Sequence, residues 1–302
     1  MGRRADSWIL TAQCPSLLGT VDVVTRFLKE QGCYITEQQS FDDIHAGRFF
    51  IRTEFIPQQD SQTVGFSSQR APEERFDAEA FKADFSQRAA GFNMDFELTS
   101  PDAKVPVVIM VSKADHCLND LLYRYRTGQL PIDIRAIVSN HSDLESLAQW
   151  HGLPYHHFPI TPQTKAEQEG KVWQVIEESG AELVILARYM QVLSSEMCSK
   201  LAGRAINIHH SLLPGFKGAK PYHQAFEKGV KLVGATAHYI NDDLDEGPII
   251  TQGVEPVSHA DDPEDLVATG RDIECLTLAR AVGLHVERRV FLHQRRTVVF
   301  SR

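Results

Sequence analysis

The chain has 302 residues, of which 42% are hydrophobic and 24% are charged, and its formal net charge at pH 7 is −9. This composition is typical of a folded globular protein and excludes wholesale disorder, and the length indicates two domains. The acidic balance argues against nucleic acid or an anionic membrane as the main partner. No apolar run reaches the roughly 20 residues that span a bilayer. The five cysteines lack CxxC spacing, so we expect reduced thiols and a cytoplasmic location.

Residues 1–98 predict a small α/β domain with the element order βαββαβ. A short apolar strand covers 8–12, and Pro15 is expected to open a helix because proline suits the first helical turn. Gly32 stands where that helix should end. The remaining predicted elements are strands at 33–40 and 48–56, a polar loop at 58–71, a helix at 76–90 and a strand at 92–98.

Residues 99–104 are polar, contain a proline and lack periodicity, so they predict a linker. From 105 to 302 the pattern changes to strands that alternate with helices, which indicates a doubly wound, mostly parallel sheet. The predicted strands are 105–111, 134–138, 155–158, 183–186, 205–208, 236–240 and 249–257. The predicted helices are 118–125, 142–150, 165–178, 196–201 and 263–289, and a hairpin covers 290–300.

Two polar segments in this second domain carry candidate chemistry. Asn207 and His209 end a predicted strand, and their spacing of two places them on one face. Such strand ends hold ligands in open α/β sheets, and an amide with an imidazole can stabilise an oxygen that becomes negative. The second segment, 241–248, contains four acids before Gly-Pro. Taken separately, the segments could also be a hydrogen-bonded strand end and a solvated acidic loop.

Together, the two segments resemble the folate-dependent formyltransferase family. Several spaced motifs match in order, which is more specific than one short motif. They are the run Asn207 to Pro214, the loop glycines Gly215 and Gly218, the pair His223 and Ala225, and the run Asp242 to Pro248. The segment 186–194 also resembles the family's folate loop. The resemblance implies that the backbone of this segment holds the pterin ring.

The resemblance also implies roles for individual residues. The catalytic group would be Asn207, His209 and Asp245. Asp245 would orient the nucleophile and accept its proton, and His209 would protonate the departing nitrogen. The implied folate-binding residues are Arg188, Met190, Gln191, Val192, Leu193, Asp242 and Gly247. No metal and no cofactor besides the folate substrate is expected.

The turn after the strand 105–111 favours hydrolysis over transfer. In the related glycinamide ribonucleotide transformylases this turn is glycine-rich and cradles a phosphate. Here it has no glycine and carries Asp115, which would repel a phosphate. Water is the simplest remaining nucleophile. Residues 1–98 resemble an ACT domain, which implies an amino-acid effector near Leu17, Leu18 and Gly19, and a homo-oligomer.

The combination of both domains resembles the formyltetrahydrofolate deformylase family. It implies hydrolysis of 10-formyltetrahydrofolate to tetrahydrofolate and formate, with formate supplied to purine synthesis. One alternative is formyl transfer to a small amine. Another is an amino-acid sensor that only binds folate.

A metalloenzyme is a further alternative, because histidines are numerous in this domain. Its candidate ligands would be His209, His210, His223 and His238. We expect His209 and His210 to lie on opposite faces, and no familiar ligand spacing is present. Whether His210 and His223 take part in catalysis stays open.

Overall fold

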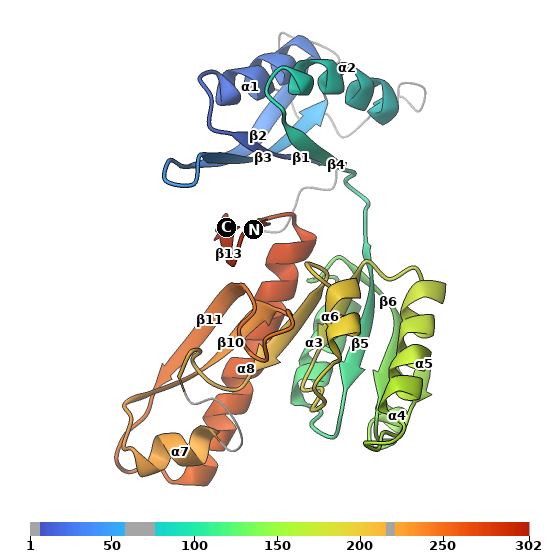
Figure 1. The fold of residues 1–302 in the computed structure, drawn as a ribbon, viewed down its shortest axis with the longest axis vertical. Coiled ribbons are helices and arrows are strands. Elements are labelled where there is room, and N and C mark those ends of the chain that lie inside the picture. Colours follow the sequence, from blue (N-terminus) through green and yellow to red (C-terminus); the bar gives the residue numbers. More distant parts are fainter. Residues whose placement is uncertain (1–6, 58–75, 216–220, 302) are drawn as a thin grey trace. The chain divides into compact units, whose positions relative to one another are not determined.

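The computed structural model describes residues 7–57, 76–215 and 221–301 (Figure 1). The chain separates into two compact units, the first reaching to Ala103 and the second covering Lys104–Ser301. The boundary lies inside the segment predicted to be a linker. Within the described ranges, no helix has the length and apolar character that crossing a membrane requires.

The first unit is an antiparallel sheet with two helices over one face (Figure 1). The elements are β1 (Trp8–Pro15), α1 (Thr20–Glu30), β2 (Cys33–Asp43), β3 (Arg48–Pro57), α2 (Ala78–Ala90) and β4 (Asp95–Thr99). The strand order is β2-β3-β1-β4. Phenylalanine rings join the two helices, since the ring of Phe27 lies 4.9 Å from that of Phe81 and 5.0 Å from that of Phe85. The ring of Phe81 also stacks on Phe55 of β3 at 5.4 Å, which joins α2 to the sheet. The predicted element order is confirmed.

The predicted start of the first helix is wrong. Pro15 is the last residue of β1, where it pairs with Arg48, and α1 begins only at Thr20. Proline is tolerated at the end of a strand because it lacks only a donor. Gly19 caps the helix with a φ of 93°, a conformation that favours glycine. The leucines at 17 and 18 therefore lie in an exposed turn. The predicted loop at 58–71 lies outside the described residues.

The second unit contains a seven-stranded sheet and a two-stranded hairpin. Its first elements are β5 (Val105–Val111), α3 (His116–Arg126), β6 (Ile132–Ser139), α4 (Glu145–Trp150), β7 (Tyr155–His157), α5 (Lys165–Glu178), β8 (Leu183–Leu186) and α6 (Ser195–Lys200). They are followed by β9 (Ala205–His209), α7 (Pro221–Glu227), β10 (Leu232–Tyr239), β11 (Ile249–Pro256), α8 (Pro263–Val286), β12 (Val290–His293) and β13 (Arg296–Val299).

The large sheet has the order β11-β10-β9-β8-β5-β6-β7. Strands β9 to β7 in that order are parallel, and β10 and β11 are antiparallel additions at one edge. The core lies on both faces: Val107 and Ile109 share one apolar cluster with α3 and α8, whereas Val108 and Met110 share the other with α5 and α6. Alternate residues of a strand reach opposite faces, so a continuous β-branched run suits β5.

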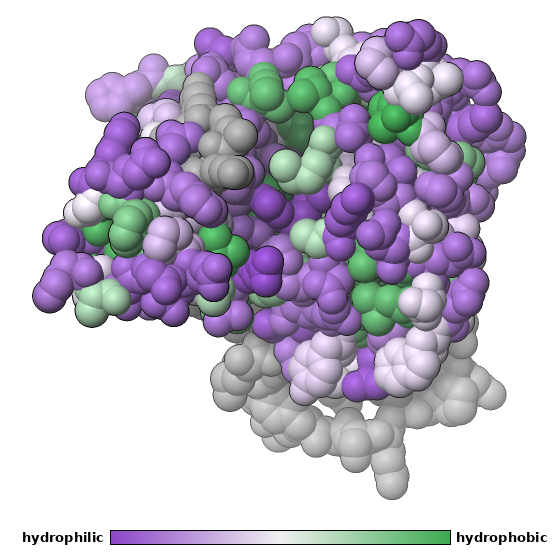
Figure 2. Space-filling view, turned by 90° about the horizontal axis from the view of Figure 1, so that it is seen from below, coloured by the Kyte–Doolittle hydropathy of each residue, from purple (hydrophilic) through white to green (hydrophobic). Residues whose placement is uncertain are grey.

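The strand order brings several polar segments together at the carboxyl ends of the parallel strands. The chain leaves β5 toward β6 on one side, while β8 and β9 lie on the other, so the order reverses between β5 and β8. Ligands of open α/β sheets bind outside the carboxyl ends of the strands at such a reversal. Figure 2 views the molecule from below, where the β5 strand ends; hydrophilic residues dominate this face, and hydrophobic residues gather beside a hollow.

Candidate active site

Three segments bring polar side chains together beyond the end of β9. Asn207 and His209 come from β9, and His238 lies directly opposite Asn207 on the neighbouring antiparallel strand β10. The Asn207 amide nitrogen lies 3.2 Å from His238 Nε2. The loop after β10 returns Asp245, whose Oδ1 lies 3.2 Å from His209 Nδ1 and 4.0 Å from His238 Nε2. The imidazole, carboxamide and carboxylate that the sequence singles out are therefore neighbours.

The loop that carries Asp245 folds tightly against the end of β10. Asp245 has a φ of 58°, a left-handed conformation that aspartate adopts more easily than most residues. The amide of Tyr239 donates to Pro248 O at 2.9 Å, which closes the loop at its base. Gly247 lies against Tyr239 so closely that a Cβ there would overlap the Tyr239 carbonyl. The loop geometry therefore directs the carboxylate back toward β9.

The electrostatics of the site favour an ionised Asp245. Partial burial raises the pKa of this carboxyl, but the hydrogen bond from His209 and the charge of His209 outweigh burial and lower it overall. Burial lowers the pKa of His238, whose Nδ1 lies 2.8 Å from its neighbour's carbonyl. A neutral His238 with its proton on Nδ1 donates to Tyr239 O and accepts from Asn207 through Nε2.

The other nitrogen of His209 has no partner among the described residues. His209 is 5% exposed, and its Nε2 is buried without a hydrogen bond. A buried polar atom without a partner is costly, so it marks a place where a ligand supplies the missing bond. The residue lines a cavity of about 600 Å³. Asp245 thus holds the ring through Nδ1 and leaves Nε2 available for a ligand in this part of the site.

Comparisons with known proteins identify the family of this chain. The family model described as formyl transferase matches residues 105–282. The formyltetrahydrofolate deformylase of Corynebacterium sp. (strain P-1) is 51% identical over 96% of this chain and 97% of its own length. The chain belongs to the formyltetrahydrofolate deformylase family.

Solved structures of two kinds of relative cover different shares of this chain. A formyltetrahydrofolate deformylase from Pseudomonas putida KT2440 has 66% identity, covers 98% of this chain and 100% of its own, and has a TM-score of 0.87. The glycinamide ribonucleotide transformylase 1 from Symbiobacterium toebii has 30% identity, covers 66% of this chain and 95% of its own, and has a TM-score of 0.61. The second relative thus matches only part of the chain.

Most of the predicted folate-binding residues of this deformylase-family chain line the same cavity as His209. They are Arg188, Met190, Gln191, Val192, Leu193 and Asp242. Their backbone segment is anchored because the Met190 amide donates to Ser112 Oγ, which donates in turn to Asn140 Oδ1. Gly247 is the exception: it belongs to the loop that carries Asp245 but lines a different cavity. Its tight packing against Tyr239 accounts for the glycine.

The expectation that His209 and His210 lie on opposite faces is wrong. Their ring centroids are 5.1 Å apart, and both rings line the cavity. His210 follows the last residue of β9, so the alternation of a strand no longer applies to it. Burial and the nearby Arg188 charge lower the pKa of His210 to about 4, so this ring is neutral at pH 7. His223, from α7, lines the same cavity.

Sequence reasoning missed a second polar cluster in this cavity. Glu274 of α8 is 1% exposed and accepts a hydrogen bond of 2.9 Å from the Tyr222 hydroxyl. His116 Nε2 lies 2.7 Å and Arg188 Nε lies 3.4 Å from Glu274 Oε2. His116 and Glu274 are 158 residues apart, and no local pattern connects them. The only available signal was a carboxylate inside an otherwise apolar helical stretch.

Part of this cluster has the composition of a metal site. Donor atoms of His116, Cys117 and Glu274 lie within 4.8 Å of one another. Binding of a metal cation there is disfavoured, because the positive charge of the Arg188 guanidinium already neutralises Glu274. A hydrogen bond with Cys275 and burial raise the pKa of Cys117, so its thiol stays protonated. The cluster is better described as a buried carboxylate that is hydrogen-bonded to His116 and Tyr222 and paired with the Arg188 guanidinium.

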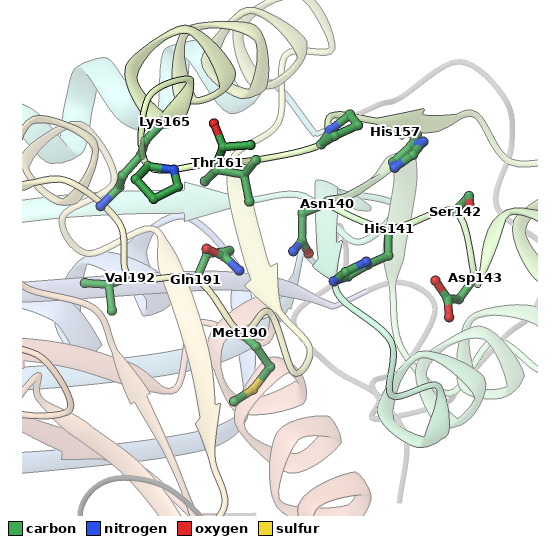
Figure 3. Close-up of a pocket in the computed structure, with 13 residues that line it drawn as sticks. Asn140, His141, Ser142, Asp143, His157, Thr161, Lys165, Met190, Gln191 and Val192 are labelled. Carbon is green, nitrogen blue, oxygen red and sulfur yellow. The ribbon is translucent and has the colours of Figure 1, made fainter.

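A second cavity adjoins the first on the other side of the Met190–Val192 segment. Its volume is about 800 Å³. Figure 3 shows Asn140, His141 and Gln191 around this space, with Lys165 at its edge. Lys165 is the only lysine or arginine among the described lining residues. The segment predicted to hold the pterin ring therefore separates two spaces.

The lowered pKa of Asp245 predicts a pH-dependent contribution to stability. Because the folded-state pKa lies below the unfolded one, the contribution is fully present above the unfolded pKa of about 4 and is lost as pH falls through the folded pKa. We expect the difference in unfolding free energy between the natural chain and Asp245→Asn to be constant near pH 6 and to shrink below pH ~4. Urea unfolding at each pH measures it, and a difference that does not change with pH would contradict the ion pair.

Proposed function

We propose that this chain hydrolyses 10-formyltetrahydrofolate to tetrahydrofolate and formate with Asn207, His209 and Asp245. The observation that carries the assignment of roles is the pairing of Asp245 with His209 Nδ1, which leaves Nε2 of this cavity-lining residue buried and without a hydrogen-bond partner among the described residues. Membership of the deformylase family supports the reaction. The released formate would serve purine synthesis in the cytoplasm.

The proposed steps follow from the positions of these three side chains. The oxygen of a water molecule forms a bond with the formyl carbon, and the Asp245 carboxylate accepts the proton. The Asn207 amide has one N–H directed to His238 Nε2 and a second that can donate to the new oxyanion, together with His209. The bond between carbon and N10 then breaks, and N10 takes a proton from His209 Nε2. The proton held by Asp245 then returns to His209 and restores the starting state, and the formic acid product releases its remaining proton and leaves as formate.

The turn after β5 supports water as the nucleophile. The Ser112 hydroxyl accepts a hydrogen bond from the Met190 amide and donates one to Asn140 Oδ1. It therefore anchors the predicted folate segment. Asp115 precedes α3, and its carboxylate accepts from the Asn119 side chain at 3.1 Å. A carboxylate at this turn opposes a phosphate, which helix N-termini otherwise attract. This turn therefore disfavours binding of an acceptor that carries a phosphate.

An assay without any acceptor tests this function. The purified chain is incubated with 10-formyltetrahydrofolate alone, and formate and tetrahydrofolate are both quantified. We expect equal amounts of the two products. Turnover that requires an added amine, with no formate released in its absence, would favour formyl transfer instead.

We also propose that the second cavity receives the acidic glutamate tail of the folate. It borders the same Met190–Val192 segment as the first cavity, and Lys165 supplies a positive charge at its edge. Lys165→Ala should raise KM for a polyglutamylated substrate by roughly fivefold, because a partly exposed ion pair contributes about 1 kcal/mol, and leave kcat unchanged. Lys171→Ala, on the exposed side of the same helix, is the control. Equal KM values for both variants would contradict this placement.

For the first unit, we propose an ACT-type regulatory domain that binds a small amino acid near Leu17, Leu18 and Gly19 in a homo-oligomer. The βαββαβ order and the exposed turn before α1 support this assignment. Equilibrium dialysis of the full chain against radiolabelled glycine and methionine tests it. Binding that Gly19→Val abolishes is expected, because valine disfavours a φ of 93°. Absence of binding to the intact oligomer would count against the effector.

A further inference from the structure

Glu274 is the centre of a hydrogen-bonded cluster that the hydrolytic steps do not use. Three elements besides its own helix contribute to it: His116 begins α3, Arg188 follows β8, and Tyr222 lies on α7. The carboxylate accepts from Tyr222 through one oxygen and faces His116 and Arg188 through the other. A carboxylate oxygen only accepts hydrogen bonds, so His116 Nε2 carries a proton.

The carboxylate is ionised despite its burial. Burial raises the pKa of Glu274, but the hydrogen bond from His116 and the positive charge of Arg188 lower it below its ordinary value. The negative charge raises the pKa of Tyr222 further than burial alone, so the hydroxyl remains a donor. The chain thus places an ionised carboxylate 3.4 Å from a guanidinium nitrogen, on two residues that line the cavity.

Arg188 has donors that the anion does not satisfy. Its Nε and Nη1 are buried and form no hydrogen bond with the described residues, although Nε lies within ion-pair distance of Glu274. The residue adopts a φ of 65°, which holds its backbone in an uncommon conformation at the start of the folate segment. A guanidinium presents a fork of donors that suits carboxylate and phosphate.

The cluster adjoins the reacting groups. The Tyr222 ring lies 6.3 Å from the His210 ring, which lies 5.1 Å from the His209 ring, and all of these residues line one cavity. Packing as well as a hydrogen bond fixes the position of Tyr222 in the cluster. Gly270, one turn before Glu274 on α8, leaves space for Tyr222, because a Cβ at 270 would overlap the tyrosine ring.

We infer that Glu274 is an internal anion that occupies an anion site formed by Arg188, His116 and Tyr222, and so excludes phosphate-bearing acceptors from the cavity. The inference deepens the proposed hydrolysis, because it names the residue that selects water over an anionic acceptor. Glu274 is a positioning and specificity residue, and it does not touch the reacting atoms. Removal of its charge should leave a buried cation without a partner, and that cation should then bind an external anion.

Anion binding to Glu274→Gln tests the inference without folate. Thermal unfolding is followed while inorganic phosphate is titrated at constant ionic strength with chloride. Phosphate should bind E274Q at least tenfold more tightly than the natural chain, so E274Q alone should show a saturable rise in Tm. Arg188→Gln combined with E274Q should abolish the rise. Asp272→Asn, which removes an exposed carboxylate of the same helix, should behave like the natural chain.

Each outcome of this experiment is informative. An E274Q chain that is unfolded without anions but recovers its fold in phosphate would support the inference equally. A folded E274Q with no gain in phosphate affinity, or an unfolded one that phosphate does not rescue, would overturn it. The measurement uses free enzyme, so it is independent of formate release, and failure of the acceptor-free assay would leave a positive anion result intact.

Discussion

Replacing Asp245 by asparagine should lower kcat for formate release by about 10³-fold, within the range of roughly 10²–10⁴ that a general acid–base group contributes. The substitution keeps the size of the side chain but removes the charge that holds His209 through Nδ1 and the acceptor of the water proton. Binding of the folate should change little. We therefore expect KM within about threefold of the natural value, since the change removes an interaction made mainly in the transition state.

The neighbouring residue provides a matched control for this substitution. Glu246 is exposed and lines a different cavity, so Glu246→Gln changes the same charge on the same loop without touching His209. Steady-state kinetics of both variants, with folate affinity measured separately, would separate chemistry from binding. Retention of more than a tenth of kcat by Asp245→Asn would remove the carboxylate from the mechanism.

Replacing Gly247 by alanine should impair both stability and activity. The new Cβ would overlap the Tyr239 carbonyl and lie 3.1 Å from His238 Nδ1, so backbone atoms must move. Overpacking of this kind costs about 1–3 kcal/mol. The displaced loop would carry Asp245 away from His209, and a misplacement of about 1 Å can cost 10²-fold in rate. Urea unfolding and kcat together measure the two effects.

A second glycine shows whether the effect depends on position. Gly170 lies in α5, and a Cβ there would have no neighbour within 4 Å. Gly170→Ala should therefore preserve activity and stabilise the helix by about 1 kcal/mol. A Gly247→Ala variant that keeps natural kcat and stability would show that the loop tolerates the displacement, and that Gly247 is not needed to place Asp245.

The sequence predicted the framework of the second unit because its signals are local. The β-branched run at Val105–Val111 and the helical period at Lys165–Glu178 match the observed elements, since hydrophobic pattern and periodicity decide both. The first helix was misplaced for the opposite reason. Leu17 and Leu18 have the spacing of an apolar helical face, which predicted a helix from Pro15. The chain instead forms a turn there, with a positive φ at Gly19, and the helix begins at Thr20.

The chemical site could be predicted only where a family motif supplied distant pairings. Asp245 and His209 are 36 residues apart, and their contact depends on the register of β10 against β9. The resemblance carried that pair, but not His238, whose position opposite Asn207 is a property of strand pairing. The Glu274 cluster joins four separate elements, so no periodicity or spacing in the chain could indicate it.

The antiparallel strand β10 divides the site into a fixed part and an adjustable part. Asn207, His209 and His238 stand on two strands joined backbone to backbone, whereas Asp245 depends on one closed loop. Loss of the hydrogen bond from the Tyr239 amide to the Pro248 carbonyl would let the loop move Asp245 away from His209. The other three side chains would stay in place. Substitutions that change how often this one turn opens would therefore change the fraction of molecules in which Asp245 contacts His209. They would not move Asn207 and His209, which stabilise the oxyanion.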